Sequence, residues 1–459
     1  MKHVHRLCCR RILMNCLKIY LMMKKVCCFL FLLVLPGLCA AQVLNLSEFE
    51  LSNGLSVVVS ENHKAPIAKV MLVYKVGAAD EVAGKSGLAH LLEHLMFRGT
   101  TNVSGERFNT LMLENGVDFN AFTSRDITAY HALTDISRLE LVLALEADRM
   151  VNLNIDDEAF SAEQKIVYQE RQQRVENNSK ARFSEDVNKI FWQNTPYEHP
   201  VSGVLKEINA LSKEDTKRFY DTYYTPSNAV LVIVGDVTVK EIKPLVEKYF
   251  GRIQKKKAPE RKMFFSIEDN SNIFVSRAMD NVEKTMISVS YAIPSVVKNK
   301  KAAYAFYVFS SYFGESGANY LKKYLVDEQQ VVAAASSSQI LSRGSGEFEI
   351  SVLPNDDDDF KATIDMIDEA FNNAMAAFDD KVLEDEKKKI LSWFVYVKDN
   401  VSDEAYFIGQ LKALGMNIED IEHYAENIEN VSIKDVKDLL PYLLKTKKMT
   451  SVLLPKEDK

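Results

Sequence analysis

The chain has 459 residues and a formal net charge of −7, with 47% hydrophobic and 26% charged residues. This length predicts two or more domains with an ample core, and the composition is ordinary for a soluble protein. No block of basic residues and no interleaving of basic with aromatic residues indicates nucleic-acid binding.

The first 47 residues contain no Asp or Glu and have the layout of an export signal. Lys24 and Lys25 precede an apolar run over 26–35, and small residues follow at 39–41. This order defines a signal peptide, and the apolar run is short for a transmembrane helix. We predict a signal peptide over residues 1–41, including an upstream extension, and export to the periplasm. The alternative is a membrane anchor formed by an uncleaved N-terminal segment.

Cleavage of that segment would change the composition of the mature chain. All six cysteines lie in the segment, so the mature chain would contain no disulfide despite its exported location. Loss of seven Lys and Arg residues without any acid would change the formal charge from −7 to about −14. Such an acidic protein is not expected to bind anionic membranes or DNA.

Strand-like alternation and helical periodicity follow each other on both sides of a charged linker at 255–262. Interspersed strands and helices predict two α+β domains, one at 45–255 and one at 263–459. In the first domain we expect strands near 54–60, 67–76, 116–123, 127–134 and 229–235, and helices near 86–98, 104–114, 136–150, 157–177 and 213–223. In the second we expect strands near 272–277, 285–292, 331–338, 346–353 and 449–454, and helices near 299–313, 318–326, 358–377, 379–396, 403–414 and 433–444.

The expected helix at 86–98 carries the motif His90-Leu91-Leu92-Glu93-His94. Histidines four residues apart lie on one helix face, one turn apart, so both imidazoles can reach one metal ion. Glu93 can then reach a water on that metal, which is the arrangement of inverted zinc-protease motifs. The alternative is an ordinary helix that carries these residues by chance. The apolar residues around the motif predict a helix packed on a core: Leu88, Leu91, Leu92, Leu95 and Met96.

A catalytic zinc takes a third protein ligand, which is often a carboxylate. The expected helix at 157–177 offers Glu163 and Glu170, which lie two turns apart on one face. Either could deliver a carboxylate to the metal, although each taken singly is better explained as a solvated helix charge. Spacing alone leaves both candidates open.

A longer run, residues 84–100, resembles the active-site helix of the pitrilysin/insulinase family of zinc peptidases. Residues 53–59 resemble the opening strand of that family, 120–123 its edge strand, and 224–236 the end of its first domain. The resemblance covers nearly the whole chain after residue 45, specifically in the N-terminal half and mainly in pattern afterwards. It implies two related α+β domains of the processing-peptidase type, which form half of a closing clamshell.

The resemblance also implies a role for each residue of the motif region. The third zinc ligand of the family is a glutamate about 75 residues after the motif, and another glutamate lies seven residues before it. Glu170 lies 76 positions after His94, and Glu163 lies seven before Glu170. The implied ligands of one Zn²⁺ per chain are therefore His90, His94 and Glu170. Glu93 is the implied general base, and Glu163 is an outer carboxylate that orients a ligand.

The expected activity is hydrolysis of peptide bonds in extended peptides or unfolded proteins. Zinc would polarise the scissile carbonyl and lower the pKa of its water to about 7, and Glu93 would pass the proton to the leaving amine. The resemblance places the substrate as an added strand beside Asn120, Ala121, Phe122 and Thr123. Without the resemblance these four residues would be interpreted as a plain edge strand.

One departure from the family concerns the second half of the chain. Self-sufficient members carry an Arg and, two residues later, a Tyr that bind substrate across the chamber. Here Tyr320 and Lys322 occupy those positions, and no arginine lies between Arg277 and Arg343. We therefore expect a dimer in which this chain is the catalytic subunit and a related chain without the zinc motif supplies the missing pair.

Two other functions remain as alternatives. The chain could be a non-catalytic scaffold or assembly subunit of the same fold, against which the complete motif and Glu170 argue. It could also be an exported metal-binding protein without hydrolysis, against which the position of Glu93 argues. His131, in an apolar strand, and His199, in a loop, are expected to be structural or solvated.

Overall fold

The computed structural model describes residues 44–261, 271–315, 317–356 and 359–456. The signal peptide predicted over 1–41 lies outside these residues. None of the helices in the described ranges is both long and apolar enough to span a membrane.

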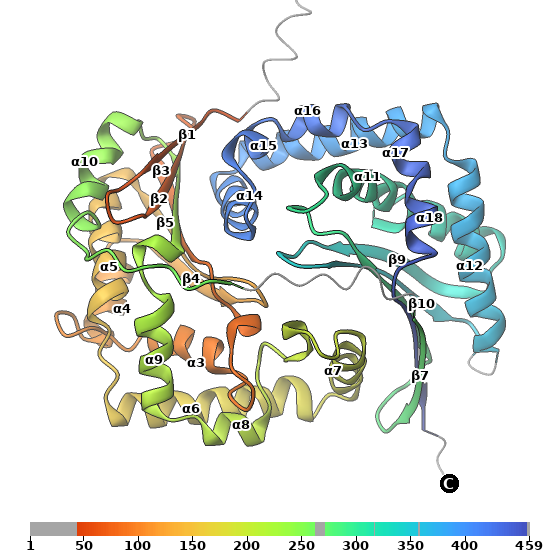
Figure 1. Cartoon of the computed structure of the whole chain (residues 1–459), viewed down its shortest axis with the longest axis horizontal. Coiled ribbons are helices and arrows are strands. Elements are labelled where there is room, and N and C mark those ends of the chain that lie inside the picture. Colours follow the sequence, from red (N-terminus) through yellow and green to blue (C-terminus); the bar gives the residue numbers. More distant parts are fainter. Residues whose placement is uncertain (1–43, 262–270, 316, 357–358, 457–459) are drawn as a thin grey trace, which may run out of the picture. The chain divides into compact units, whose positions relative to one another are not determined.

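The first half of the chain builds a six-stranded sheet with the order β1-β2-β6-β3-β5-β4 (Figure 1). Neighbouring strands are antiparallel except for the parallel pair β2 and β6. The central strand β6 is buried along its whole length, which explains its continuous apolar sequence. The strands are β1 (Leu46–Glu50), β2 (Ser56–Glu61), β3 (Ile67–Tyr74), β4 (Asp118–Thr123), β5 (Thr128–Asp135) and β6 (Ala229–Gly235).

Helices of the first half cover one face of this sheet. Because strand side chains alternate between faces, Val57, Val70 and Leu72 point into this helical layer, where they share a core with Leu91 and Leu92. The helices are α3 (Leu88–Leu95), α4 (Gly105–Glu114), α5 (Leu139–Asn152), α6 (Asp157–Arg171), α7 (Ser179–Phe191), α8 (Leu205–Ala210), α9 (Lys213–Tyr223) and α10 (Val239–Tyr249).

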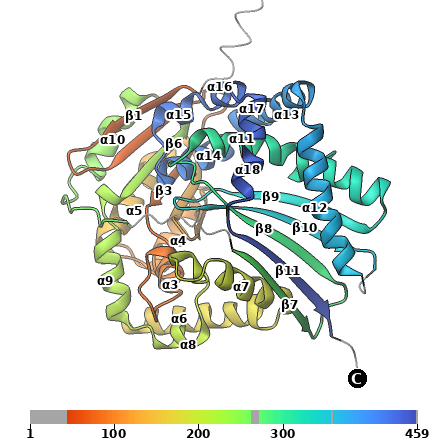
Figure 2. The same cartoon turned by 45° about the vertical axis from the view of Figure 1, so that its right-hand side comes forward.

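The second half builds a five-stranded sheet with the order β7-β11-β8-β10-β9 (Figure 2). Its strands are β7 (Asn272–Met279), β8 (Met286–Ile293), β9 (Val332–Ile340), β10 (Gly346–Pro354) and β11 (Lys448–Pro455). Its helices are α11 (Lys300–Ser310), α12 (Phe360–Ala377), α13 (Asp380–Asp399), α14 (Val401–Leu414), α15 (Ile418–Glu422), α16 (Tyr424–Glu429), α17 (Ile433–Lys437) and α18 (Leu439–Leu443).

The two sheets share one topology once β1 is set aside. In each sheet the last strand of the half lies between the first two, parallel to the first and antiparallel to the second. The remaining hairpin then extends the sheet on the far side, as β5-β4 in the first and β10-β9 in the second. This common order fits the expectation that both halves descend from one α+β fold.

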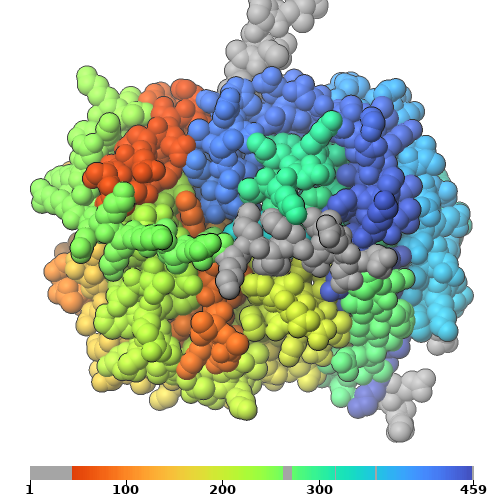
Figure 3. Space-filling model, in the orientation of Figure 1, coloured from red at the N-terminus to blue at the C-terminus, as the bar shows by residue number. Residues whose placement is uncertain are grey.

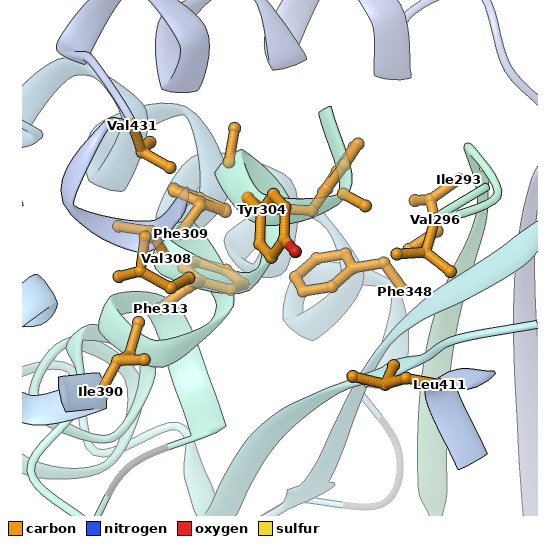
Figure 4. Close-up of a cluster of buried hydrophobic side chains, with 14 of the residues drawn as sticks. Ile293, Val296, Tyr304, Val308, Phe309, Phe313, Phe348, Ile390, Leu411 and Val431 are labelled. Atoms are coloured by element: carbon orange, nitrogen blue, oxygen red, sulfur yellow. The ribbon is translucent and has the colours of Figure 1, made fainter. Parts of the chain in front are cut away.

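The core of the second half lies between its sheet and α11. Figure 4 shows the aromatic side chains of α11 and the following turn facing Phe348 of β10. The ring of Phe309 lies 6.4 Å from that of Phe348 and 5.3 Å from that of Phe313, and all three side chains are buried. This aromatic packing holds α11 on the sheet.

Helix α14 of the second half covers the other face of the first sheet, where it packs on β3 and β6. Gly409 makes this approach close, because a Cβ there would lie 2.8 Å from the sulfur of Met71. The ring of Tyr406 also lies 5.1 Å from that of Phe122 on the edge strand β4. In the space-filling view the red N-terminal strands meet blue C-terminal helices (Figure 3), and Lys412 Nζ lies 2.7 Å from Glu48 Oε1 there.

The predicted strands are all present within a few residues, and β1 is an additional strand. The helix predicted at 433–444 is instead the pair α17 and α18, because Pro441 has no N–H with which to continue α17. The helices predicted at 157–177 and 299–313 end in π-helical turns, η3 (Gln172–Glu176) and η6 (Ser311–Glu315). The helix predicted at 318–326 is largely the π-helical segment η7 (Lys322–Glu328). The sequence patterns did not identify α7, α8, α10, α15 or α16.

Candidate metal centre

Helix α3 is fixed at its start by a glycine and a distant carboxylate. Gly87 precedes the helix with φ of 86°, and a Cβ at this position would lie 3.0 Å from the Cα of Gly203. The backbone N–H groups of Gly87 and Ala89 donate to the carboxylate of Glu81 at 3.1 and 2.8 Å. Glu81 thus satisfies amides that a helix start leaves unpaired. Burial raises its pKa well above the ordinary value, despite these bonds.

The apolar face of α3 packs on the sheet and turns the motif toward α6. Leu91, Leu92 and Leu95 are completely buried, whereas the polar motif residues are half-buried. Helix α3 lies against α6 (Figure 1), and its histidines lie near the glutamates of that helix. The packing of the leucine face of α3 on the core therefore determines where the histidines and Glu93 on its other face point.

Three side chains converge where α3 and α6 meet. His90 Nε2 lies 3.9 Å and His94 Nε2 lies 3.5 Å from the same oxygen, Oε2 of Glu170. One ligand atom from each of the three residues lies within 4.8 Å of the others. Two imidazoles and a carboxylate suit zinc, whose bonds to such ligands are about 2.0–2.2 Å long. The three donor groups therefore fit a single zinc ion.

Glu163 of α6 contacts the ring of His94 on the side away from the cluster. Glu163 Oε2 lies 2.9 Å from His94 Nδ1, and the other oxygen of Glu163 pairs with Arg98. Burial opposes charge on His94, but the bond to Glu163 and the surrounding carboxylates outweigh burial and raise the pKa of His94. With the Nδ1 proton directed at Glu163, the Nε2 lone pair is directed at the cluster.

His90 is electrostatically different from His94. Burial, together with the nearby charge of His94, lowers the pKa of His90 to about 4. The ring is therefore neutral near pH 7, which is the form in which histidine binds a metal.

Glu93 lies on the same face and is held by the edge strand. The hydroxyl of Thr123 donates a hydrogen bond to Glu93 Oε2. Burial raises the pKa of Glu93, although this bond and the charge of His94 lower it. The carboxylate that could accept a proton is thus anchored directly to strand β4.

A cavity of about 970 Å³ opens over these residues, and all of its lining residues lie between positions 90 and 202. It brings together the motif on α3, the edge strand β4, the end of α6 with η3, and α7. Its lining includes His90, Glu93, His94 and Glu170, together with residues 120–123. A cavity beside the edge strand of a sheet can accept an extended chain.

Two family models match the chain, and together they cover more than half of it. The model described as "Insulinase (Peptidase family M16)" matches residues 56–204, which include the whole cluster. The model described as "Peptidase M16 inactive domain" matches residues 210–390. The chain belongs to the M16 (pitrilysin/insulinase) family.

Several known proteases resemble the chain in sequence or in structure. The "Zinc protease PqqE" of Helicobacter pylori is 31% identical over 62% of this chain and 65% of its own, so the chain matches just under two thirds of that relative. The crystal structure of a protease from Helicobacter pylori superposes with a TM-score of 0.83 and 25% identity, covering 90% of this chain and 100% of that one. The periplasmic protease PqqL from Escherichia coli shares the fold, with a TM-score of 0.73 and 17% identity, over 90% of this chain and 48% of its own.

Within this M16 chain, the structure brings together the residues predicted as metal ligands, general base, outer carboxylate and substrate-binding strand. His90, His94 and Glu170 form the cluster, and Glu163 contacts His94 from outside it. Residues 120–123 lie on β4, at the free edge of the sheet. His131 lies outside the cluster on β5, where its Nδ1 is 2.9 Å from Lys69 Nζ, whereas His199 lines the cavity.

Other residues of the M16 site were not identified from the sequence. Arg98 pairs with Glu163, and Arg174 Nη1 lies 2.6 Å from Glu170 Oε1. The spacing of Glu170 and Arg174, four residues apart on a helix, is a signal that could have revealed the second pair. Glu81 carries no such signal, because its contact with α3 is formed only by the fold.

We expect Glu163→Gln to weaken zinc binding by about 10- to 100-fold, because it removes the charge that orients His94 and leaves Arg98 without its partner. Titration of the apoprotein with zinc, against a competing chelator, measures this change. Glu158→Gln, at an exposed position in the first turn of the same helix, is the matched control and should bind zinc normally. Equal zinc affinity in the two variants would contradict the orienting role of Glu163.

Proposed function

We propose that this protein is an exported zinc endopeptidase that cleaves extended peptides or unfolded proteins. The observation that carries the proposal is the convergence of His90, His94 and Glu170 within 4.8 Å, beside the carboxylate of Glu93. Hydrolysis needs a ligand set for the metal and a base within reach of a water, and this cavity offers both.

The three converging residues would hold one zinc ion per chain, with Nε2 of each histidine and Oε2 of Glu170 as the donors. Bound there, zinc would supply a Lewis acid that polarises a carbonyl and lowers the pKa of water. Glu163 keeps the proton of His94 on Nδ1, and Arg174 holds the second oxygen of Glu170.

Glu93 would take the proton of the attacking water and pass it to the leaving amine. The hydroxyl of Thr123 donates a hydrogen bond to Glu93 and so holds its carboxylate in the cavity. Because Thr123 belongs to β4, the base would stay in register with any chain that pairs with this strand.

The free edge of β4 would bind the substrate backbone. Ser124 N donates to Ile127 O at 2.8 Å, and this bond shows which residues of β4 are hydrogen-bonded to β5. Paired and unpaired positions alternate in such a ladder, so the backbone groups of Ala121 and Thr123 point to the open edge. An extended peptide can add there as a strand, with recognition mainly of its backbone.

Three observations support a partner chain. All the residues that line the cavity come from the first half of the chain. Tyr320, at the position of the family arginine, packs instead against Tyr312 and Tyr324, with ring centroids 5.5 and 5.9 Å away. PqqL is about twice as long as the part of it that this chain matches. We propose that a second, related subunit without the zinc motif completes the chamber and supplies the missing Arg/Tyr pair.

Export is supported by the composition of residues 1–41 and by the periplasmic location stated for PqqL. The proposed location is therefore the periplasm. Mass analysis of the mature N-terminus would test it, and an intact residue 1 on the native protein would contradict cleavage.

The enzyme activity is tested with an unstructured, internally quenched peptide and the zinc-loaded protein purified together with any partner from its native host. We expect cleavage that a chelator removes and zinc restores, and that is absent from Glu93→Gln. No cleavage by the zinc-loaded native complex would contradict the proposal. Recovery of homodimers alone would contradict the second subunit but leave the peptidase intact.

A further inference from the structure

Arg125 presents an unneutralised charge to the cavity. It lies in the short connection between β4 and β5 (residues 124–127), is half-buried and lines the same cavity as the metal cluster. Its guanidinium donates a hydrogen bond to the amide oxygen of Asn188. Among the residues that the structure describes, no carboxylate lies within 4.0 Å of it.

The other two arginines of the cavity differ in this respect. Arg171 pairs with Glu176 and Glu185 at 3.0 and 2.5 Å, and Arg174 pairs with Glu170. Their charges are therefore balanced within the chain. A partly desolvated guanidinium without an anionic partner is unfavourable unless a ligand supplies one.

The position of Arg125 is fixed before any ligand binds. Its carbonyl accepts a 2.8 Å hydrogen bond from Ala79 N. Its guanidinium lies 5.8 Å from the ring centroid of Trp192 and 5.5 Å from that of Tyr197. A guanidinium stacked on two rings loses little entropy when it binds a carboxylate.

A carboxylate nearby in the second half does not neutralise this charge. The charge of Arg125 acts on Glu347 of β10, but no ion pair joins the two residues. Glu347 is half-buried and receives the indole N–H of Trp192 at 3.4 Å, and the loss of solvent around it raises its pKa. Apart from its bond to Asn188, the guanidinium thus has no anionic partner among the described residues, and a ligand carboxylate could supply one.

The register of β4 places Arg125 close to the scissile bond. Thr123 holds Glu93, and Arg125 follows two residues later, so the Cα atoms of Thr123 and Arg125 lie at most about 7 Å apart. A peptide paired with β4 would therefore bring a residue one to three positions from the scissile bond within reach of the guanidinium.

We propose that Arg125 binds a carboxylate of the peptide substrate and so selects peptides with an acidic group near the scissile bond. This inference rests on the proposed peptidase function and deepens it. The carboxylate can come from an Asp or Glu side chain or from the C-terminus of a short peptide. Both sources offer the same planar pair of oxygens, which a guanidinium binds with two parallel hydrogen bonds.

The test measures binding apart from cleavage. Fluorescent peptides of one neutral host sequence carry a single Glu or Gln scanned through each position, with either a free or an amidated C-terminus. Their affinity for zinc-loaded Glu93→Gln protein is measured by anisotropy. We expect at least one Glu peptide, or the free-acid peptide, to bind about 10-fold or more tightly than its neutral twin. The arm that shows this preference identifies the source of the carboxylate.

Arg125 variants in the same Glu93→Gln background assign the preference to this side chain. Arg125→Gln should abolish the preference while neutral peptides bind as before, and Arg125→Lys should keep part of it. Arg182→Gln makes the same change of net charge at an exposed position of α7 outside the cavity and should keep all of it. Equal binding of acidic and neutral peptides, or a preference that survives Arg125→Gln, would overturn the inference. A preference without any cleavage by the unmodified protein would support the inference and overturn the proposed peptidase.

Discussion

Replacing Glu93 with glutamine should lower kcat/KM for peptide hydrolysis by about 10²- to 10⁴-fold, the range contributed by a general base. The change preserves the size of the side chain and an oxygen that can accept the hydroxyl of Thr123. It removes only the ability to accept a proton. Zinc should remain bound at one ion per chain, because the three proposed ligands are unchanged. Steady-state cleavage of a quenched peptide and elemental analysis of the same sample measure both quantities.

Two further variants separate proton transfer from positioning. Thr123→Ser keeps a hydroxyl for Glu93, whereas Thr123→Val removes it. We expect near-normal activity in the first and an intermediate loss in the second, because Glu93 is then less well held. Turnover in Glu93→Gln equal to that of the unmodified protein would refute the role of Glu93. Loss of zinc from Glu93→Gln would show instead that the carboxylate supports the metal.

The sequence determined the part of the site that lies on one helix. The periodicity of an α-helix places His90 and His94 one turn apart, so their common face followed from spacing alone. The third ligand did not follow, because Glu163 and Glu170 share a face of α6 and only tertiary packing distinguishes them. The structure directs Glu170 at Nε2 and Glu163 at Nδ1 of His94. Family resemblance had made the same assignment without any geometry.

Contacts between distant segments were beyond the reach of sequence patterns. Helix α14 has a weakly amphipathic sequence because both of its sides are covered, by the first sheet and by its own half of the chain.

Helix α10 could have been found, since Thr238 and Glu241 form a capping box, but Pro244 within it obscured the helical pattern. That Arg125 lacks the ion pairs of the other two cavity arginines could be recognised only from the folded structure.

A buried ion cluster, made of Asp80, Asp126, Arg261 and Arg343, joins the two halves beside the site. Arg261 binds Asp80 with two hydrogen bonds of 3.1 and 2.7 Å. Arg343 lies 3.3 Å from both aspartates, through Nη1 to Asp80 and Nε to Asp126. The side chains of Asp80, Asp126 and Arg343 are 5–6% exposed, so water screens these charges little. The cluster is neutral as a whole, and it spans the first half, the linker and the second half.

Because the cluster is buried, removing one of its charges should be costly. Arg343→Met leaves two aspartates with one arginine, and we expect it to lower the free energy of unfolding by about 3–5 kcal/mol. Unfolding in urea, followed by fluorescence and circular dichroism, measures this loss. Arg252 is exposed and forms no ion pair with any residue that the structure describes, so Arg252→Met is the control and should change stability by about 0.5 kcal/mol or less.

A second substitution can restore the charge balance. Asp126→Asn keeps an oxygen that can accept the 2.7 Å bond from the hydroxyl of Tyr197 and the 3.0 Å bond from Arg343 N. Combined with Arg343→Met, it leaves one aspartate facing one arginine. The double variant should therefore lose less stability than the sum of the two single variants, since neighbouring charges couple. Strictly additive losses would show that each side chain contributes by packing alone, and that charge balance does not hold the two halves together.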